Sequence, residues 1–170
     1  MSLALATAGT FTGIWSNRTA RTAISADAER LSGYATTIFR SFLGSATGQR
    51  QWAEPISKLI ELRDRCSAED WDGEGASPIS PAAFDEAVTL LTALPSTFPP
   101  PEPLPEPNSS IAFEWYRGRD RVYILSVSGR KSIEFAGLFG AGNELHGRVN
   151  FESALPKRIQ QDLASFLAPQ

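Results

Sequence analysis

The sequence predicts an α+β fold, in which N-terminal helices precede a three- to four-stranded antiparallel meander and a C-terminal helix. Apolar residues recur at helical spacing up to residue 94, and after residue 110 they alternate with other residues at the spacing of strands. A proline-rich segment separates the two patterns. Of the 170 residues, 42% are hydrophobic and 21% are charged, which is close to the average of globular proteins. The length fits one domain, or one domain with an appendage.

Residues 1–50 are expected to form an N-terminal arm and an amphipathic helix, and residues 51–170 a single α+β domain. The helical spacing of this first part begins after Ser25 and includes Phe39 and Phe42. We expect these two phenylalanines to pack on a partner protein or on a second copy of the chain.

A helical pair is predicted over residues 54–94. The first helix runs from about Glu54 to Cys66, with Pro55 in its first turn, where a missing backbone N–H is tolerated. Ile56 and Leu59 contribute to its apolar face.

The second helix of the pair has clear start and stop signals. Ser80 is a suitable N-cap residue, and Pro81 follows in the first helical position. Ile79 and Phe84 have the spacing of a hydrophobic staple. Pro95 cannot continue the helix, so the sequence predicts that it ends there.

Residues 95–109 are predicted to form a stiff spacer. Seven of the chain's twelve prolines lie between positions 95 and 107. Such a run favours an extended, largely polyproline II conformation.

The meander is predicted over residues 110–151, with turns at residues 117–120 and 128–131. A glycine-rich stretch then leads to a fourth strand near residues 145–151. The last helix is predicted over residues 156–167, with an apolar face made by Ile159, Leu163, Phe166 and Leu167.

Charge and cysteine content limit the function classes. Residues 51–107 carry three basic and eleven acidic side chains, a net charge of −8, whereas residues 108–170 have a net charge of +2. The single cysteine excludes an internal disulfide and fits a cytoplasmic location. No apolar run approaches the ~20 residues of a membrane span, so no membrane contact is expected.

The loop from Trp71 to Ala76 is the most distinctive motif. Two glycines, two acids and an indole in six residues exceed what a simple connection needs. We predict Trp71, Asp72 and Glu74 as contacts to a partner protein, because tryptophan is enriched at binding hot spots.

The same loop imitates the start of a calcium-binding EF-hand. Asp70, Asp72 and Glu74 have the first spacings, but Pro81 stands where a glutamate must coordinate. We therefore predict no EF-hand site and no metal. A weaker cation site that includes Glu69 is left open as an alternative.

Few residues of the chain are of types that commonly serve in catalysis. The chain has one histidine, His146, and one cysteine, Cys66, and its glycines do not form a phosphate loop. We therefore expect no cofactor and no enzymatic activity. The alternative is a metal-dependent hydrolase that uses the carboxylates of Glu114, Glu134 and Asp72.

A second alternative is binding of single-stranded nucleic acid. Basic residues decorate the predicted meander beside aromatic ones, as in single-strand binders. The acidic isoelectric point near 5.2 argues against this role. The basic residues are Arg117, Arg119, Arg121, Arg130 and Lys131.

Between residues 56 and 135 the chain resembles a loosely defined group of small uncharacterised bacterial proteins. The shared features are a Trp-Asp-Gly-x-Gly-Ala loop, a Pro-Ile-Ser helix start, a proline-rich link and a strand ending in Glu-Trp. Here they are Trp71–Ala76, Pro78–Ser80, Pro99–Pro107 and Glu114-Trp115. No activity is known for the group, so the resemblance implies none.

Small proteins of this kind often act beside the product of a neighbouring gene, as antitoxins and accessory factors do. By that analogy we predict a non-enzymatic protein-binding module that is antitoxin-like, immunity-like or an accessory subunit of a larger bacterial system. Its expected partner is another protein, such as one encoded by a neighbouring gene.

Overall fold

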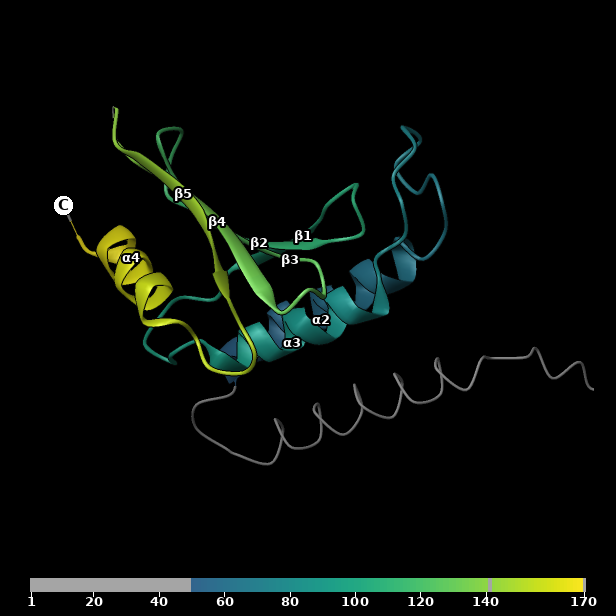
Figure 1. Cartoon of the computed structure of the whole chain (residues 1–170), viewed down its shortest axis with the longest axis horizontal. Coiled ribbons are helices and arrows are strands. Elements are labelled where there is room, and N and C mark those ends of the chain that lie inside the picture. The colour runs from purple at the N-terminus through teal and green to yellow at the C-terminus, as the bar shows by residue number, and fades with distance from the viewer. Residues whose placement is uncertain (1–49, 141, 170) are drawn as a thin grey trace, which may run out of the picture.

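The computed structural model describes residues 50–140 and 142–169 of the chain (Figure 1). Two helices, a five-stranded antiparallel sheet and a last helix follow one another, so the predicted α+β class is confirmed. The predicted N-terminal arm and helix, with Phe39 and Phe42, lie outside the described residues.

Helix α2 (Arg50–Arg65) packs beside α3 on one side of the sheet (Figure 1). Its described part covers a full turn before the predicted start, and Trp52 in that turn is only 4% exposed. Pro55 therefore lies inside the helix and not in its first turn, so that prediction is wrong. Burial of the indole stabilises the added turn, and sequence spacing around the proline does not reveal this.

Helix α3 (Pro81–Ala93) begins and ends as predicted. Ser80 has an extended backbone, and its Oγ accepts a hydrogen bond from the backbone N of Ala83 at 3.0 Å. Ile79 and Phe84, the two members of the expected staple, are both buried. Because caps depend on neighbouring residues alone, this helix could be predicted most sharply.

The sheet contains one more strand than the predicted maximum of four. Its strands follow in chain order, and each is antiparallel to the next. They are β1 (Glu102–Pro105), β2 (Ile111–Tyr116), β3 (Arg121–Val127), β4 (Ser132–Phe139) and β5 (Glu144–Asn150).

The additional strand, β1, lies inside the predicted polyproline spacer, so the spacer prediction is wrong over Glu102–Pro105. These residues pair with Ile111–Glu114 of β2. A strand inside a sheet uses backbone N–H groups on both of its sides, and proline has no N–H to donate. Strand β1 lies at the sheet edge, where only one side is paired. The prolines therefore do not prevent strand pairing.

The two faces of the sheet have different environments. Alternate side chains of β2, β3 and β4 point toward the helices and form the core, including Phe113, Tyr123 and Leu125 at 0% exposure. We call this the inner face. Helices α2 and α3 lie below it in Figure 1, and no described helix lies on the opposite side, the outer face.

Helix α4 (Lys157–Leu167) closes one end of the core. Its predicted apolar residues Ile159, Leu163 and Phe166 are fully buried. The Phe166 ring lies 5.8 Å from the rings of both Tyr123 and Phe139, between centroids. The last helix is therefore fixed to the sheet by an aromatic cluster.

Candidate functional site

The acidic loop, residues 69–76, is held together by its own carboxylates. Asp72 Oδ1 accepts hydrogen bonds from the backbone N of Glu74 at 2.9 Å and of Ala76 at 3.0 Å. Asp70 Oδ1 does the same for the backbone N of Gly75 at 2.7 Å. These two acids therefore stabilise a structured turn.

Trp71 stabilises the same loop from within. Its indole Nε1 donates to the backbone O of Ser77 at 3.0 Å, and its half-buried ring packs against the core. The Glu74 side chain is exposed. Partner contact by Trp71, Asp72 and Glu74 stays a prediction, and Glu74 is the member of the set that can be changed without disturbing the loop.

Asp72 makes the loop sensitive to acid. Hydrogen bonds from the backbone N–H groups of Glu74 and Ala76 lower the pKa of Asp72 below its ordinary value of 3.8. The stabilising effect of the carboxylate is therefore present above the unfolded pKa of 3.8 and is lost as the pH falls through the lower pKa of the folded state.

We expect the Trp71 indole N–H resonance to keep its position from about pH 7 to about pH 4 and to shift below that. Asp72→Asn keeps an oxygen acceptor at the same place but cannot titrate, so its Trp71 resonance should lack this acid transition. An NMR pH titration of both proteins tests this. An identical transition in Asp72→Asn would contradict a role for this carboxylate.

The outer face of the sheet presents apolar side chains to solvent. Among the residues that the structure describes, the large hydrophobic side chains that are exposed are Leu104 at 37%, Tyr116 at 64% and Leu138 at 39%. All three occupy outer positions of β1, β2 and β4. The strand register places Tyr116, Val122 and Leu138 in one row across three strands.

The neighbouring row continues this apolar area. Ile124, half-buried at the centre of β3, stands opposite Glu114 on one side and Ala136 on the other. Leu104 stands opposite the buried Ala112. The centre of the outer face is therefore apolar on adjacent strands.

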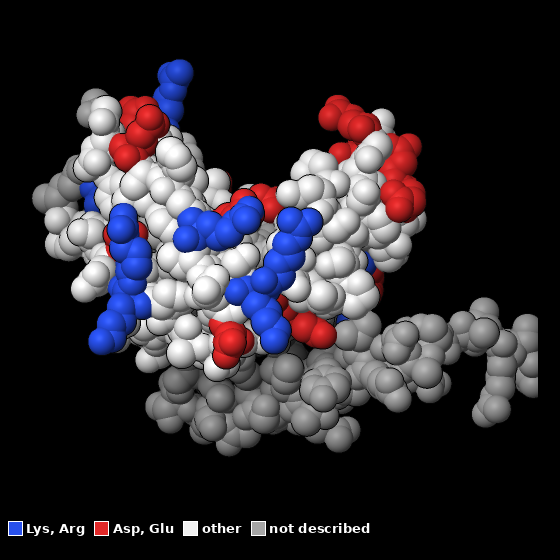
Figure 2. Space-filling model, in the orientation of Figure 1, with Lys and Arg blue, Asp and Glu red and all other residues white. Residues whose placement is uncertain are grey.

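The outer face is also hollowed. A depression of about 630 Å³ lies over β3, β4 and β5, and its walls include Ile124, Ala136 and His146. Figure 2 shows the molecule concave on this side, between the strand ends and the acidic loop, with acidic side chains at both rims and a Lys or Arg side chain beside them at the strand ends. The loop is fixed to that end of the sheet, because the Ser77 backbone N donates to Pro107 O at 2.9 Å.

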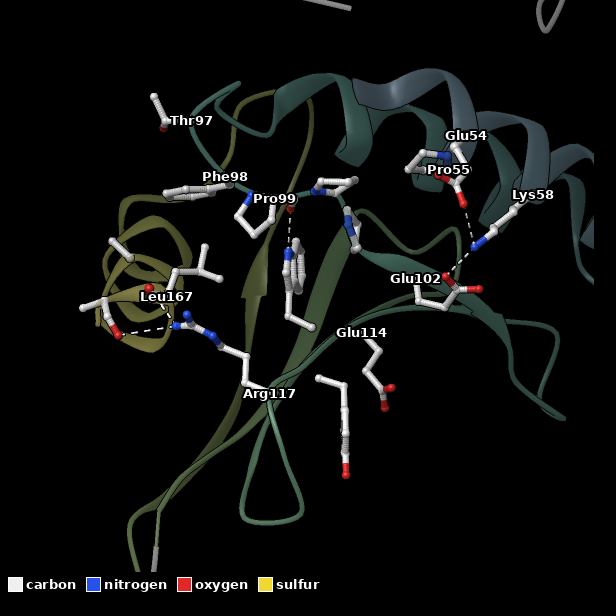
Figure 3. A pocket seen from close by; sticks show the side chains of 16 residues that line it. Glu54, Pro55, Lys58, Thr97, Phe98, Pro99, Glu102, Glu114, Arg117 and Leu167 are labelled. Atoms are coloured by element: carbon white, nitrogen blue, oxygen red, sulfur yellow. Dashed lines mark hydrogen bonds and ion pairs between the residues drawn. The ribbon is translucent and has the colours of Figure 1, made fainter. Parts of the chain in front are cut away.

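A second, larger groove of about 910 Å³ lies at the sheet edge, between α2 and α4 (Figure 3). Its wall includes the proline segment, to which Trp115 is fixed because its Nε1 donates to Pro99 O at 2.8 Å. Lys58 Nζ lies between two carboxylates, 3.2 Å from Glu54 and 2.6 Å from Glu102. The ion pairs and prolines of this groove thus serve to join α2 to the edge strand.

Two residues of the predicted nucleic-acid set bind the chain's own backbone. Arg117 Nη1 donates to Leu167 O at 2.7 Å, and Arg121 Nη2 donates to Phe166 O at 2.7 Å (Figure 3 shows the first contact). Both guanidinium groups thereby satisfy carbonyls at the C-terminus of α4, where positive charge is favourable.

The other three basic residues, Arg119, Arg130 and Lys131, are exposed in turns. The outer face between these turns carries carboxylates, as the register shows for Glu114 and Glu134. Nucleic-acid binding stays an alternative prediction that gains no support from this arrangement.

The candidate catalytic residues are distributed over different parts of the fold. Glu114 and Glu134 occupy outer positions of β2 and β4, with β3 between them, and Asp72 belongs to the acidic loop. Cys66 is fully buried in the core, whereas His146 is exposed on the outer side of β5. Within residues 50–140 and 142–169, no three His, Cys, Asp or Glu side chains are gathered closely enough to hold a metal ion.

The outer face was missed by sequence reasoning, although a signal was present. The stretch from Val122 to Val127 is apolar at five of its six positions, so both faces of β3 are apolar. Such a strand is expected to be covered on both sides. A second side that none of the described helices covers is therefore informative about function.

No known protein family, curated protein or solved structure matches this chain in the comparisons made. In the part of the chain that the structure covers, no helix is both long and apolar enough to cross a membrane.

Proposed function

We propose that this chain is a non-enzymatic protein-binding module whose contact surface is the outer face of its sheet. The observation that carries the proposal is the exposure of Leu104, Tyr116 and Leu138 on one face that no described helix covers. Contiguous exposed apolar areas with a polar rim mark interaction sites. Tyrosine and other aromatic residues are enriched at such sites.

The fold supports this role because the face is rigid. Every outer position belongs to a strand that is paired on at least one side, and β2, β3 and β4 are paired on both. A rigid surface orders few groups on binding and so loses little conformational entropy. The finer form of the proposal, an antitoxin-like, immunity-like or accessory subunit, rests on the analogy with small proteins that act beside the product of a neighbouring gene.

Affinity capture with the tagged full-length chain tests this function. Tyr116→Ser/Leu138→Ser removes two exposed apolar side chains from the outer face without adding charge. We expect the unmodified chain to retain one stoichiometric, nuclease-resistant partner from the cells that naturally produce it, and the double variant to lose it. Circular dichroism should show the same fold in both proteins, because the two side chains are exposed.

Glu74→Ala is the matched control, since it changes an exposed side chain of the acidic loop. It should retain the partner if the outer face is the contact surface. Retention by the double variant and loss by Glu74→Ala would instead place the contact on the loop. A captured component that disappears after nuclease treatment would contradict protein binding altogether.

A further inference from the structure

The outer face carries a charge pattern that limits what can cover it. Three carboxylates, those of Glu114, Glu134 and Glu144, stand at outer strand positions, and Glu106 follows β1 beside them. The outer positions of the five described strands carry two basic side chains, His146 and Arg148. The face is therefore an apolar centre with an acidic rim.

Two of these carboxylates have a partner within the chain. Glu134 pairs with Arg148, and Glu106 Oε1 accepts a hydrogen bond from Ser126 Oγ at 2.9 Å.

Glu114 and Glu144 make no described hydrogen bond or ion pair through their side chains. They flank the apolar centre in the register, since Glu114 stands opposite Ile124 and Glu144 opposite Leu138. A covering molecule with positive charges on either side of an apolar stripe would complement both features at once. A covering molecule without such charges would desolvate two unpaired carboxylates, which is costly.

The width of the outer face is suited to one covering helix. A five-stranded sheet is about 19 Å wide, because neighbouring strands are about 4.8 Å apart. An α-helix with its side chains is about 10–12 Å across. One helix therefore covers the apolar rows of β2, β3 and β4, and its flanks reach the carboxylates on both sides.

We propose that the outer face binds a basic amphipathic helix of a partner protein. The helix lays its apolar stripe on Tyr116, Ile124 and Leu138, and its lysines or arginines face Glu114 and Glu144. This inference rests on the proposed function and adds the chemistry of the partner.

The same charges disfavour the other occupants of an apolar sheet face. A second copy would bring its own row of carboxylates against this one, which is repulsive. Phosphate-bearing surfaces, such as nucleic acid or anionic lipid, are repelled for the same reason. The negative charge of the rim therefore favours a cationic protein segment.

The probe for the test is an 18-residue synthetic peptide of leucine and lysine arranged as an amphipathic helix. Two matched peptides serve as controls. One has glutamate at every lysine position, and the other has the same leucines and lysines in an order without amphipathic spacing. Titration into the full-length chain by calorimetry should give saturable binding for the first peptide, and at least about tenfold weaker binding for the other two.

Charge reversal locates the contact. Glu114→Lys/Glu144→Lys should weaken binding of the amphipathic basic peptide about tenfold or more, because two attractions become repulsions. Asp85→Lys/Glu152→Lys makes the same change of net charge at exposed positions on α3 and after β5. This control should weaken binding by less than about threefold. Added salt should weaken peptide binding more for the unmodified chain than for Glu114→Lys/Glu144→Lys.

Three results overturn the inference. The first is equal weakening by both charge reversals, which indicates attraction to net charge alone. The second is no saturable binding, as expected if another segment of the chain occupies the face. The third is a concentration-dependent dimer in sedimentation that Tyr116→Ser/Leu138→Ser dissociates, which assigns the face to a second copy.

The failure of this inference is distinguishable from that of the proposed function. If Tyr116→Ser/Leu138→Ser loses the captured partner and no peptide binds, the proposed protein-binding function stands and the basic helix is contradicted. A partner that the double variant keeps removes the outer face as the contact surface, whatever the peptides do.

Discussion

Gly129→Ala is expected to lower the free energy of unfolding by about 2–4 kcal/mol. Gly129 has φ +79°, a conformation that L side chains rarely adopt. A Cβ there would lie 2.5 Å from Ala82 Cβ and 2.9 Å from the backbone N of Ala83, in the first turn of α3. The β3–β4 turn and the helix start would have to separate, which also lengthens the 2.6 Å hydrogen bond from Gly129 N to Glu86 Oε2.

Gly73→Ala is a closely matched control for this prediction. Gly73 has φ +78°, nearly the same backbone strain, but an added Cβ meets nothing within 4 Å. We expect it to cost about 1 kcal/mol, the price of the left-handed conformation alone. Urea denaturation of the two variants gives both values, and equal losses would show that the turn does not contact α3 as closely as described.

Phe166→Ala is expected to lower the free energy of unfolding by about 3–5 kcal/mol. The ring is fully buried and touches the aromatic side chains of Tyr123 and Phe139. The Arg121 guanidinium lies 5.6 Å from its centroid, so a cation–π contact is lost as well. Because the cavity opens between α4 and the sheet, the amides of α4 should lose hydrogen-exchange protection first.

Leu167→Ala serves as the comparison for Phe166→Ala, since Leu167 is the next residue of α4 but is only partly buried. Its expected cost is about 1–2 kcal/mol, because less apolar surface leaves water. Urea denaturation and hydrogen exchange of both variants are the measurements. Comparable losses from the two substitutions would contradict the described orientation of α4.

The elements that could be predicted are those whose signals are local. Helix α3 follows from Ser80, Pro81 and Pro95, and each of these acts on residues one turn away. Strand β2 follows from alternation around Phe113, and β3 from a short apolar run between two turns. Helix α4 follows from apolar spacing of three and four residues.

The features that could not be predicted depend on contacts distant in sequence. The composition of Glu102–Pro105 favours polyproline II, and only pairing with β2 makes this segment a strand. From the sequence, Arg117 and Arg121 are predicted to be surface charges, because the carbonyl groups that they bind at the end of α4 lie 45 to 51 residues away. Trp71 is of a residue type that is enriched at binding hot spots. Its hydrogen bond to Ser77 O shows a second role within the loop.

The outer face illustrates the same limit for function. Alternation identifies two faces of β3, but which of them the helices cover depends on where α2 and α3 pack. Tyr116 and Leu138 are 22 positions apart in the sequence and are brought into one row only by the register of three strands. The candidate site is therefore a property of the sheet and of no single motif.

The most direct measurement is the affinity of the captured partner, once purified, for the unmodified chain and for Tyr116→Ser/Leu138→Ser. We expect a loss of about 30-fold to 1,000-fold, since each of the two truncated anchors contributes about 1–2 kcal/mol. Glu74→Ala should bind within about twofold of the unmodified chain. Equal affinities of the unmodified chain and the outer-face double variant would contradict the claim that this face is where the protein binds its partner.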